Sequence, residues 1–592
     1  MGRPEQTDSA NDKERATVAG THLEQLPLED PQDHGFIADS SELPKGYYKS
    51  PSFIGTICAV GFASAGAVGG FALAAPNLSI INADIGPVPG SVVDWVSLVY
   101  TLGGAVGLLL VGRLSDLFGR RWFMIGGSTL ALVGSIIAAT AQTIPVLIGA
   151  VSIIGVAAAA QLSFTLVSNE LVPMKHRFLM NGIIYLWSVP ISGIGPAVSK
   201  AFVLQTSAGW RGGFYLMIAV NATAAILYTI FYFPPTFEEK FSGRTKLQQL
   251  KDFDFLGACL FTAGLVLFLL GLSSGGTVYP WDSAIVISFL VVGVAVLVAF
   301  ALWEIYAPLR EPLLPVKLFK RFSWVAVSVD LGLGASVYYA MAIIWPQMVA
   351  VLYTDDGGAS MRAGWLNTIP GITIVAGQIT AGPLARHVGK TKIQGIVCLL
   401  VGGSLLAGIA SCGVGDLARA AALMAVGNFF IGWLESILLV NAGIDIANQR
   451  DIGVALGAAT SMRSTISTFA STIYLTVLSN RLATTIPAVV PPALVAAGLP
   501  RSQVEAFLTG LTTGNLTGVQ GLTPSIATAG KQAYQKANAM AFSTVFLTTL
   551  AFTGVAVVLS FFLPNVDDAM SGQVSATLHQ RREKRANEAK EV

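Results

Sequence analysis

Charged residues are scarce in this chain. Asp, Glu, Lys and Arg together make up 12% of its 592 residues, whereas the apolar types AVILMFWYC make up 53%. A soluble domain of ordinary composition carries about 25% charged residues, and the mean hydropathy here is +0.64. A chain of this composition cannot keep the surfaces of several soluble domains hydrated. Soluble, disordered and disulfide-rich secreted classes are therefore excluded, which leaves an integral membrane protein with many spans.

Cysteine and histidine are also sparse. The four cysteines all fall inside apolar runs, so no pair indicates a disulfide that closes a loop. The five histidines all lie in expected tails or loops, which leaves none inside the membrane for haem binding or catalysis. We expect no bound metal and no cofactor. A membrane enzyme is thus a remote alternative, and a multi-span receptor is excluded by no single residue.

Long apolar runs are abundant. A bilayer core of about 30 Å requires about 20 apolar helical residues. An all-α membrane protein with fourteen spans is predicted, with both termini on one side. The fourteen stretches are 53–75, 92–111, 122–141, 145–167, 179–200, 213–233, 254–273, 283–303, 323–345, 363–383, 393–412, 418–440, 453–478 and 541–563.

Basic residues mark alternate connections between these spans. The connections on one side, beginning with that between the second and third spans, carry seventeen Lys and Arg residues, and the opposite short connections carry four. The positive-inside rule therefore predicts that both termini are cytoplasmic. The sequons at Asn77 and Asn515 fall on the predicted outer side, where they are candidates for N-glycosylation.

The connection between the second and third spans contains Gly112, Asp116, Gly119, Arg120 and Arg121. Gly112 allows two helices to approach closely, and Gly119 permits a tight turn. Asp116 can pair with a cation or with a helix N-terminus, and we expect both arginines at the lipid headgroups. The pattern resembles the inner-loop signature of the major facilitator superfamily, G-x-x-x-D-[RK]-x-G-[RK]-[RK], except that leucine replaces its first basic residue. This segment is interpreted as a gating motif.

The connection after the tenth span resembles a degenerate second copy of this motif. Gly382, Gly389 and Lys390 keep the same offsets, whereas Arg386 replaces the aspartate. Related segments at corresponding points of two halves are typical of transporters built from internal repeats. We therefore expect a major facilitator fold, with two six-helix bundles and two extra helices between them.

The fifth span contains Gly182, Gly195 and Pro196, which resemble part of the antiporter signature of the same superfamily. Proline and glycine inside a span can kink the helix. These three residues are predicted to form a hinge, although a merely kinked helix explains them as well.

At a finer level the chain resembles the fungal trichothecene efflux pump family. The resemblance implies drug:proton antiport driven by the proton gradient, which exports a small amphipathic metabolite, toxin or drug across the lipid bilayer. We expect no nucleic-acid partner. Fungal siderophore transporters have a similar layout, so an importer remains an alternative. The resembling segments are Gly112 to Trp122, Asn169 to Pro173 with Arg177, Trp345 to Gln347, Arg463 with Ile473 and Tyr474, and Gly498 to Pro500.

Away from the ends of the predicted spans, three charged residues remain. Asp330, Glu435 and Arg463 lie in the ninth, twelfth and thirteenth spans. A charge in mid-bilayer costs about 2.5–3.5 kcal/mol even on a mild scale, so such residues usually face a partner or a cavity. At 1.5 Å per residue, Glu435 and Arg463 lie at depths that their side chains can bridge. We expect Glu435 or Asp330 to take up the driving proton, with Arg463 modulating it; a pair that only fixes helix register is the alternative.

Polar and aromatic residues near the middle of the spans form the expected substrate pocket, because aromatic walls with a few amides suit an amphipathic ligand. For any one of them taken alone, ordinary packing is the better explanation. These residues are Gln161, Phe164, Tyr185, Trp187, Tyr338, Tyr339, Asn428 and Trp433.

The expected protein is a monomer in the plasma membrane, with a vacuolar or vesicle membrane as the alternative. Its expected segments are a disordered cytoplasmic tail at 1–50, a first bundle at 51–233, a linker with two extra helices at 234–322, a second bundle at 323–563 that includes a long outer loop at 479–540, and a cytoplasmic tail at 564–592.

Overall fold

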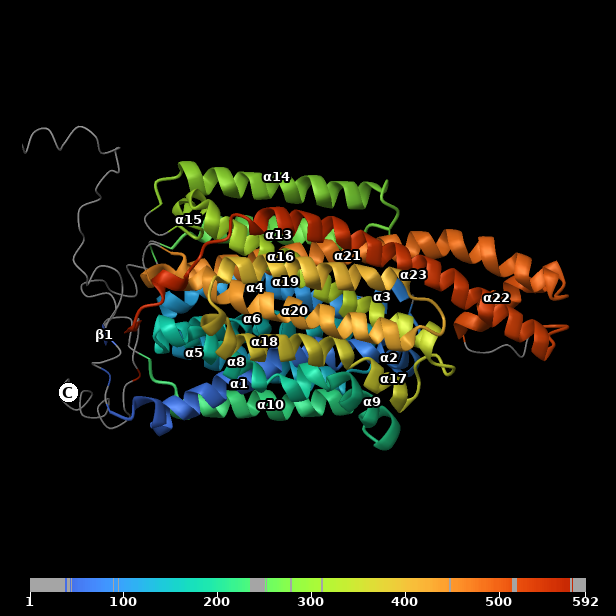
Figure 1. Cartoon of the computed structure of the whole chain (residues 1–592), viewed down its shortest axis with the longest axis horizontal. Coiled ribbons are helices and arrows are strands. Elements are labelled where there is room, and N and C mark those ends of the chain that lie inside the picture. The colour runs from blue at the N-terminus through green and yellow to red at the C-terminus, as the bar shows by residue number, and fades with distance from the viewer. Residues whose placement is uncertain are drawn as a thin grey trace, which may run out of the picture.

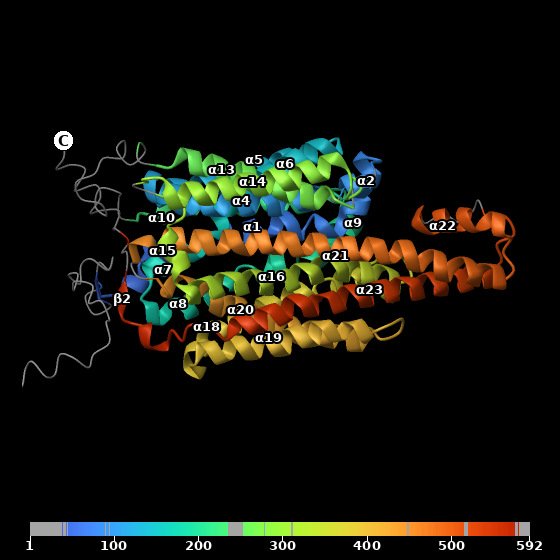
Figure 2. The same ribbon diagram turned by 90° about the horizontal axis from the view of Figure 1, so that it is seen from above.

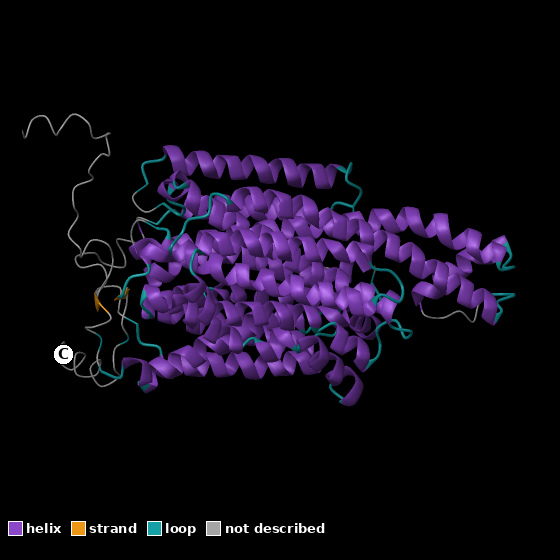
Figure 3. Ribbon diagram, in the orientation of Figure 1, coloured by secondary structure: helices purple, strands orange, loops and turns teal. Residues whose placement is uncertain are grey.

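The computed structural model is almost entirely helical, with its longer helices running along one axis (Figures 1 and 3). Most of the predicted tail at 1–50, and the chain beyond 578, lie outside the described residues. The structure describes residues 38–39, 43, 45–88, 90–93, 95–234, 251, 253–276, 279–309, 312–446, 449–513, 519–574 and 578.

The α-helices in chain order are α1 (Pro51–Ala72), α2 (Leu78–Ile85), α3 (Gly90–Val93), α4 (Trp95–Phe118), α5 (Arg120–Thr140), α6 (Ile144–Leu162), α7 (Phe164–Leu171), α8 (Arg177–Leu186), α9 (Gly195–Gln205), α10 (Arg211–Phe231), α13 (Phe255–Ser274), α14 (Ala284–Tyr306), α15 (Val316–Lys320), α16 (Phe322–Met348), α17 (Met361–Leu366), α18 (Ile369–Val388), α19 (Thr391–Gly408), α20 (Leu417–Ile444), α21 (Ile452–Ala496), α22 (Val504–Thr513) and α23 (Pro524–Ser560).

Shorter elements connect or interrupt them. The 3-10 turns are η2 (Tyr47–Lys49), η3 (Ala75–Asn77), η4 (Met174–His176), η7 (Ile409–Ser411), η8 (Gln449–Asp451), η9 (Arg501–Gln503) and η10 (Asp567–Ala569). The π-helical segments are η5 (Val189–Gly193) and η6 (Val349–Tyr353), and the strands are β1 (Ala38–Asp39) and β2 (Gln573–Val574).

Local sequence signals explain where several long helices begin. The Ser50 side chain caps α1 by accepting a hydrogen bond from the Phe53 amide at 3.2 Å. The Asp254 carboxylate caps α13 in the same way, at 2.8 Å from the Gly257 amide. Such caps satisfy amides that have no partner within the helix. Inside each helix the backbone is bonded within the segment, which hydrocarbon requires.

All fourteen predicted spans coincide with helix in the structure. Among the described residues, eleven helices are long and apolar enough to cross a membrane, so the count of fourteen stays a prediction. The three remaining spans are the second, fifth and tenth. The second retains a shorter apolar stretch at 99–115. The fifth is broken into three pieces, and the tenth is divided between α17 and α18.

The helices form two groups that meet along two seams (Figure 2). In the first group α1, α4, α5, α6 and α10 pack against one another, and in the second α16, α18, α19, α20, α21 and α23 do so. The α4–α21 seam and the α8–α18 seam join the groups. Helices α4 and α18 form the second span of their respective groups, and α8 and α21 belong to the fifth span of theirs. Each seam therefore joins the second span of one group to the fifth span of the other, as an internal repeat would require.

Helices α13 and α14 pack against each other at the edge of the bundle, with α14 outermost in Figure 1. The Trp303 indole donates to the Asp254 carboxylate at 2.9 Å, which joins the two helices near their shared end. Valines such as Val291, 62% exposed, cover the outer face of α14. The position of this pair at the edge agrees with the extra pair expected between the two six-helix bundles, and that division of the chain stays a prediction.

Helix α1 begins and α23 ends at the same end of the bundle, which we call the tail end (Figures 1 and 2). Strands β1 and β2 pair antiparallel, so the segments that precede α1 and follow α23 meet. This arrangement agrees with an even number of crossings. We call the opposite end the hairpin end.

The segment 479–540, expected as a loop, is largely helical. Helix α21 has 45 residues and α23 has 37, which correspond to about 68 and 56 Å and exceed a hydrocarbon core of about 30 Å. Their ends, with α22, project beyond the other helices instead of covering them (Figure 2). This helical hairpin has its own core, which includes Val490, Leu494 and Phe507.

The buried Phe507 ring predicts how the helical hairpin can be loosened. Phe507 is 0% exposed and occupies the space beside Gly530. Phe507→Ala should destabilise the hairpin by about 3–5 kcal/mol, because it leaves a cavity in the core. Tryptic cleavage at exposed Arg501 of the purified protein should become faster. Val495→Ala, at a 37% exposed position, is the control; equal cleavage of both variants would contradict the prediction.

Candidate functional site

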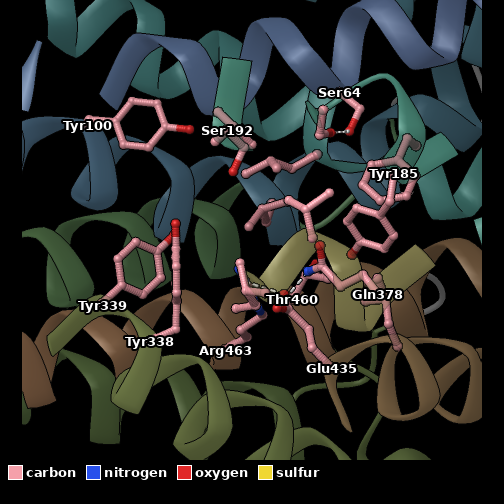
Figure 4. A pocket seen from close by; sticks show the side chains of 18 residues that line it. Ser64, Tyr100, Tyr185, Ser192, Tyr338, Tyr339, Gln378, Glu435, Thr460 and Arg463 are labelled. Atoms are coloured by element: carbon pink, nitrogen blue, oxygen red, sulfur yellow. Dashed lines mark hydrogen bonds and ion pairs between the residues drawn. The ribbon is translucent and has the colours of Figure 1, made fainter. Parts of the chain in front are cut away.

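A central cavity lies between the two groups of helices (Figure 4). Its volume of about 90 Å³ is below the 300–1,000 Å³ that drug-sized ligands usually occupy. The first group contributes Ser64, Val68, Tyr100, Leu108, Leu162, Phe164, Tyr185, Ser188 and Ser192. The second contributes Tyr338, Tyr339, Ile374, Val375, Gln378, Glu435, Leu439, Thr460 and Arg463. In this conformation the cavity is smaller than a typical site for a drug-sized ligand.

An ion pair between Glu435 and Arg463 forms the polar part of this cavity. The second carboxylate oxygen of Glu435 accepts a hydrogen bond from the Gln378 amide at 3.0 Å. The exposed fractions of the Glu435 and Arg463 side chains are 8% and 14%, and the guanidinium lies 6.0 Å from the centre of the Tyr339 ring. The three polar residues come from α20, α21 and α18. The second group therefore holds all the charge that lines the cavity.

Four of the eight predicted pocket residues line the cavity: Phe164, Tyr185, Tyr338 and Tyr339. Phe164 and Tyr185 pack edge to face at 5.6 Å, and the two adjacent tyrosines do so at 5.4 Å. Figure 4 shows Tyr185 on one side of the cavity and the Tyr338–Tyr339 pair on the other. Aromatic rings from both groups thus face the ion pair.

The other four predicted pocket residues lie elsewhere, which corrects the prediction. Gln161 donates to Asn221 at 2.7 Å, between α6 and α10. Asn428 contacts Met424 within its own helix, and Trp433 donates to Gln394 at 2.9 Å toward α19. Trp187 lines a separate cavity on the outer face of the first group. The position of a residue along a predicted span gives its depth in the membrane, but it does not show which face of the helix the side chain occupies.

Several residues of the site were missed at the level of sequence. Gln378 matters most because it binds the Glu435 carboxylate. Its position as a polar amide inside an apolar span could have identified it as a candidate site residue. Ser64, Ser188 and Ser192 gave weaker signals, because serine is common in spans where helices approach closely.

Asp330, the other predicted proton carrier, is 0% exposed in α16 and does not line the central cavity. Neither carboxylate oxygen has a hydrogen-bond partner among the residues that the structure describes. The structure thus brings together Glu435 and Arg463 and leaves Asp330 apart from them.

Glycines of the loop motif and of its copy occupy equivalent places. A Cβ on Gly112 would lie 2.6 Å from the Gly453 carbonyl oxygen in α21. A Cβ on Gly382 would lie 2.9 Å from the Gly182 Cα in α8. Each motif glycine therefore permits the backbone contact of its own seam, which supports the internal repeat.

The second glycines of the two motifs also correspond. Gly119 has φ +88° between α4 and α5, and Gly389 has φ +65° between α18 and α19. Glycine adopts this backbone region at little cost. Lys390 follows with φ +51° and donates its amide to Asp567.

The fifth span is broken, as its glycines and prolines suggested, but the break lies at 187–194. Gly182 belongs to the seam contact, and Gly195 with Pro196 opens α9. Between them the Ser188 carbonyl accepts hydrogen bonds from the amides of Ile191, Ser192 and Gly193. A π-helical segment of this kind widens the helix locally.

Polar contacts between the groups close the tail end of the cavity. The Arg177 guanidinium, 0% exposed, donates to the Gly443 carbonyl at 3.1 Å and to the Gln449 side chain at 2.9 Å. Asn181 donates to the Ser436 hydroxyl at 3.3 Å. Arg177 thus binds the carboxyl end of α20, where a cation is favoured.

The α8–α18 seam carries further basic residues at the tail end. Arg386 donates to the Lys175 carbonyl at 3.0 Å. Burial lowers the pKa of the neighbouring His176, and the charges of Lys175 and Arg386 lower it further. Since the usual value is about 6.5, His176 is neutral at pH 7.

The arginines of the loop motif lie within the first group. Arg120 is buried and paired with Glu170 of α7, so its predicted position at the headgroups is wrong. Arg121 donates to the Thr229 carbonyl at 2.8 Å and stacks on the Phe233 ring at 4.0 Å. The Asp116 side chain lies outside the described residues.

The glycosylation prediction for Asn77 is also corrected. Asn77 is 1% exposed, and its amide donates to the Ser199 hydroxyl at 2.6 Å. A glycan cannot be accommodated at a buried, hydrogen-bonded amide. Asn515 lies outside the described residues.

Comparison with known proteins agrees with this geometry. The sequence model described as fungal trichothecene efflux pump (TRI12) matches residues 16–591. The chain belongs to this family. The trichothecene efflux pump of Fusarium sporotrichioides is 27% identical and covers 95% of this chain and 94% of its own. That of Trichoderma arundinaceum is 28% identical, with 91% and 90% covered.

Solved structures confirm the major facilitator fold. The human organic anion transporter MFSD10 aligns with a TM-score of 0.53 and 13% identity, over 86% of this chain and 100% of its own. The proton:xylose symporter XylE aligns with a TM-score of 0.52 and 13% identity, over 90% and 99%. Membership in this family of efflux pumps makes the chain a membrane transport protein and not an enzyme.

The glycine contact in the α8–α18 seam predicts a conformational effect. Gly182→Ala should loosen closure at the tail end, because the new methyl group meets the Gly382 backbone at 2.9 Å. In a chain whose four cysteines are replaced by alanine, a membrane-impermeant thiol reagent should label Thr460→Cys several-fold faster from the tail end. Gly126→Ala, where a Cβ meets open space, is the control. Unchanged labelling in Gly182→Ala would refute the prediction.

Proposed function

We propose that this protein exports an amphipathic toxin or secondary metabolite in exchange for protons, by alternating access to the central cavity. The names of the two similar relatives, both trichothecene efflux pumps, support the cargo class. The observation that carries the coupling is the ion pair of Glu435 with Arg463, which lines a cavity between two repeats.

Glu435 is the proposed proton carrier. As a carboxylate it accepts from both Arg463 and Gln378, which offsets the cost of charge in a low-dielectric site. Protonation removes its negative charge and leaves Arg463 without that counterion. Proton binding and the ion pair therefore exclude each other, and this competition can bias the conformation. Asp330 is proposed as a second protonatable group, outside the cavity.

The substrate is proposed to bind between the aromatic walls, near Arg463. Because the present cavity is about 90 Å³, binding requires the two groups to separate at one end. The close glycine contacts of the seams permit such rocking, with the break between Gly182 and Gly195 as the proposed hinge. Opening the tail end must break the contacts of Arg177 and Asn181 with the second group.

The tail end is proposed to face the cytoplasm, because the basic connections gather on that side of the predicted topology. Outward export then requires loading at the tail end and release at the hairpin end. The plasma membrane is the proposed location, with the monomer as the working unit.

Glu435→Gln tests the coupling. Glutamine can keep a hydrogen bond to Gln378 but cannot carry a proton or pair with Arg463 as an anion. In inside-out vesicles, proton-driven uptake of a radiolabelled trichothecene should fall at least tenfold, whereas exchange of labelled for unlabelled cargo without a gradient should persist. Glu304→Gln is a matched control, since Glu304 is a buried carboxylate of α14 outside the cavity that accepts from the Leu314 amide.

The same vesicles decide direction. Acidifying the interior of inside-out vesicles should drive cargo inward if the protein is an exporter, and an uncoupler should abolish that uptake. Proton-driven movement of a ferric siderophore in the opposite direction would establish the importer instead. Wild-type coupling in Glu435→Gln would refute its role as proton carrier without deciding direction.

A further inference from the structure

A second cavity lies on the outer side of the first group, and we call it the lateral cavity. Its volume is about 590 Å³, against about 90 Å³ for the central cavity, and it falls within the range of drug-sized sites. The residues that line it are apolar except for the indole N–H of Trp187. They are Phe62 and Ala65 of α1, Leu186, Trp187, Pro190, Ile191, Ile194 and Val198 of the fifth span, and Leu216 and Val220 of α10.

The fifth span presents opposite faces of its helix to the two cavities. Ser188 and Ser192 line the central cavity, whereas Pro190 and Ile191 line the lateral cavity. Helix α1 divides in the same way at Ser64 and Ala65. The wall between the two cavities is therefore one helix layer thick, and Ser64 and Ser188 touch within it, with their hydroxyl oxygens 3.4 Å apart.

The lateral cavity opens at mid-depth of the predicted bilayer. Pro190 is exposed and lies thirteen residues after Arg177, about 20 Å along the helix, and Leu186 beside it is 52% exposed. The opening thus faces hydrocarbon. None of the residues that line the cavity is charged, and the Trp187 indole N–H is the single side-chain hydrogen-bond donor among them.

Two aromatic rings form the deep wall of this cavity. Phe62 and Trp187 pack with ring centroids 4.9 Å apart. Gly61 makes room for the indole, since a Cβ there would lie 2.3 Å from Trp187 Cγ. Flat rings beside branched aliphatic side chains suit a compact, ring-containing molecule.

We propose that the lateral cavity takes up apolar cargo dissolved in the bilayer, before the cargo crosses the Ser64–Ser188 wall into the central cavity. This inference rests on the proposed export function and names a route for its substrate. The occupant is a compact, ring-containing hydrophobic molecule, favoured over a phospholipid because the cavity offers apolar contact at mid-depth and no headgroup contact.

Photolabelling tests the occupant. The purified full-length protein in phosphatidylcholine nanodiscs is irradiated with 3-trifluoromethyl-3-phenyldiazirine, an apolar ring-containing carbene precursor. Labelling at Phe62, Ala65 and Val220 should exceed that at lipid-facing Val291 at least fivefold. Ile194→Trp, which fills the cavity, should remove most of this excess. Ile226→Trp, on the 57% exposed lipid face of α10, should leave it unchanged.

Two results would overturn the inference. The first is labelling that shows no cavity preference, either because the cavity residues are labelled no more than Val291 or because Ile194→Trp leaves their excess labelling unchanged. The other is strong labelling by a phosphatidylcholine with a mid-chain diazirine that excess free diazirine probe does not displace, because a lipid then occupies the cavity. A binding curve for folded Ile194→Trp with cargo in detergent, matching the wild type, controls for misfolding.

Transport kinetics separate this inference from the proposed function. Ile194→Trp should raise the KM for a membrane-partitioning trichothecene about fivefold with little change in kcat, because loading is impaired while the central cavity is intact. Unchanged KM together with normal export would overturn the lateral route and leave the export function standing. Absence of export by the wild type would refute the proposed function, whereas the labelling pattern would still report on the cavity.

Discussion

The cost of charge in hydrocarbon constrains the whole site. A lone charged side chain at mid-bilayer costs about 2.5–3.5 kcal/mol on a mild scale, so a retained charge needs a partner at the same depth. Glu435 obtains two, Arg463 and Gln378, from the neighbouring helices α21 and α18. Three helices of one repeat must therefore keep a fixed register around this carboxylate. The other repeat faces the Glu435–Arg463 pair with aromatic rings and hydroxyl groups.

The close helix contacts at the two seams are also a consequence of the lipid environment. Helices in lipid gain no hydrophobic energy by associating, so they adhere through close backbone contact. The Gly112 contact with α21 and the Gly182–Gly382 contact provide it at equivalent points of the repeat. Such contacts involve few interlocking side chains. The specificity of closure then comes from polar groups at the tail end, above all Arg177 on the Gly443 carbonyl and the Gln449 side chain. A closed state held by a few hydrogen bonds can open without unpacking a core.

Prediction from the sequence succeeded for features that the hydrocarbon of the bilayer imposes directly, namely apolar spans and paired charges. The fourteen spans predicted from hydropathy all coincide with helix, and the cost of buried charge singled out Glu435 and Arg463 before their contact was known. It failed where direction around a helix decided the outcome. Trp187 has the right depth for the central cavity, but it lies on the opposite face of its span. The segment 479–540 was expected as a loop, whereas α21 continues through Pro487 and Pro491 and packs in one cluster with Phe507. Asn77 matched a sequon, and only the fold revealed its burial.

The broken fifth span lies between the two cavities. A break in a membrane helix leaves backbone groups that need new partners, and here the Ser188 carbonyl supplies one for three amides. Ser188 and Ser192, four residues apart, lie on the helix face that lines the central cavity, whereas Pro190 and Ile191 lie on the opposite face and line the lateral cavity. The segment η5 also packs against α18, as α8 does. The proposed rocking of α8 against α18 would therefore also displace the wall between the two cavities.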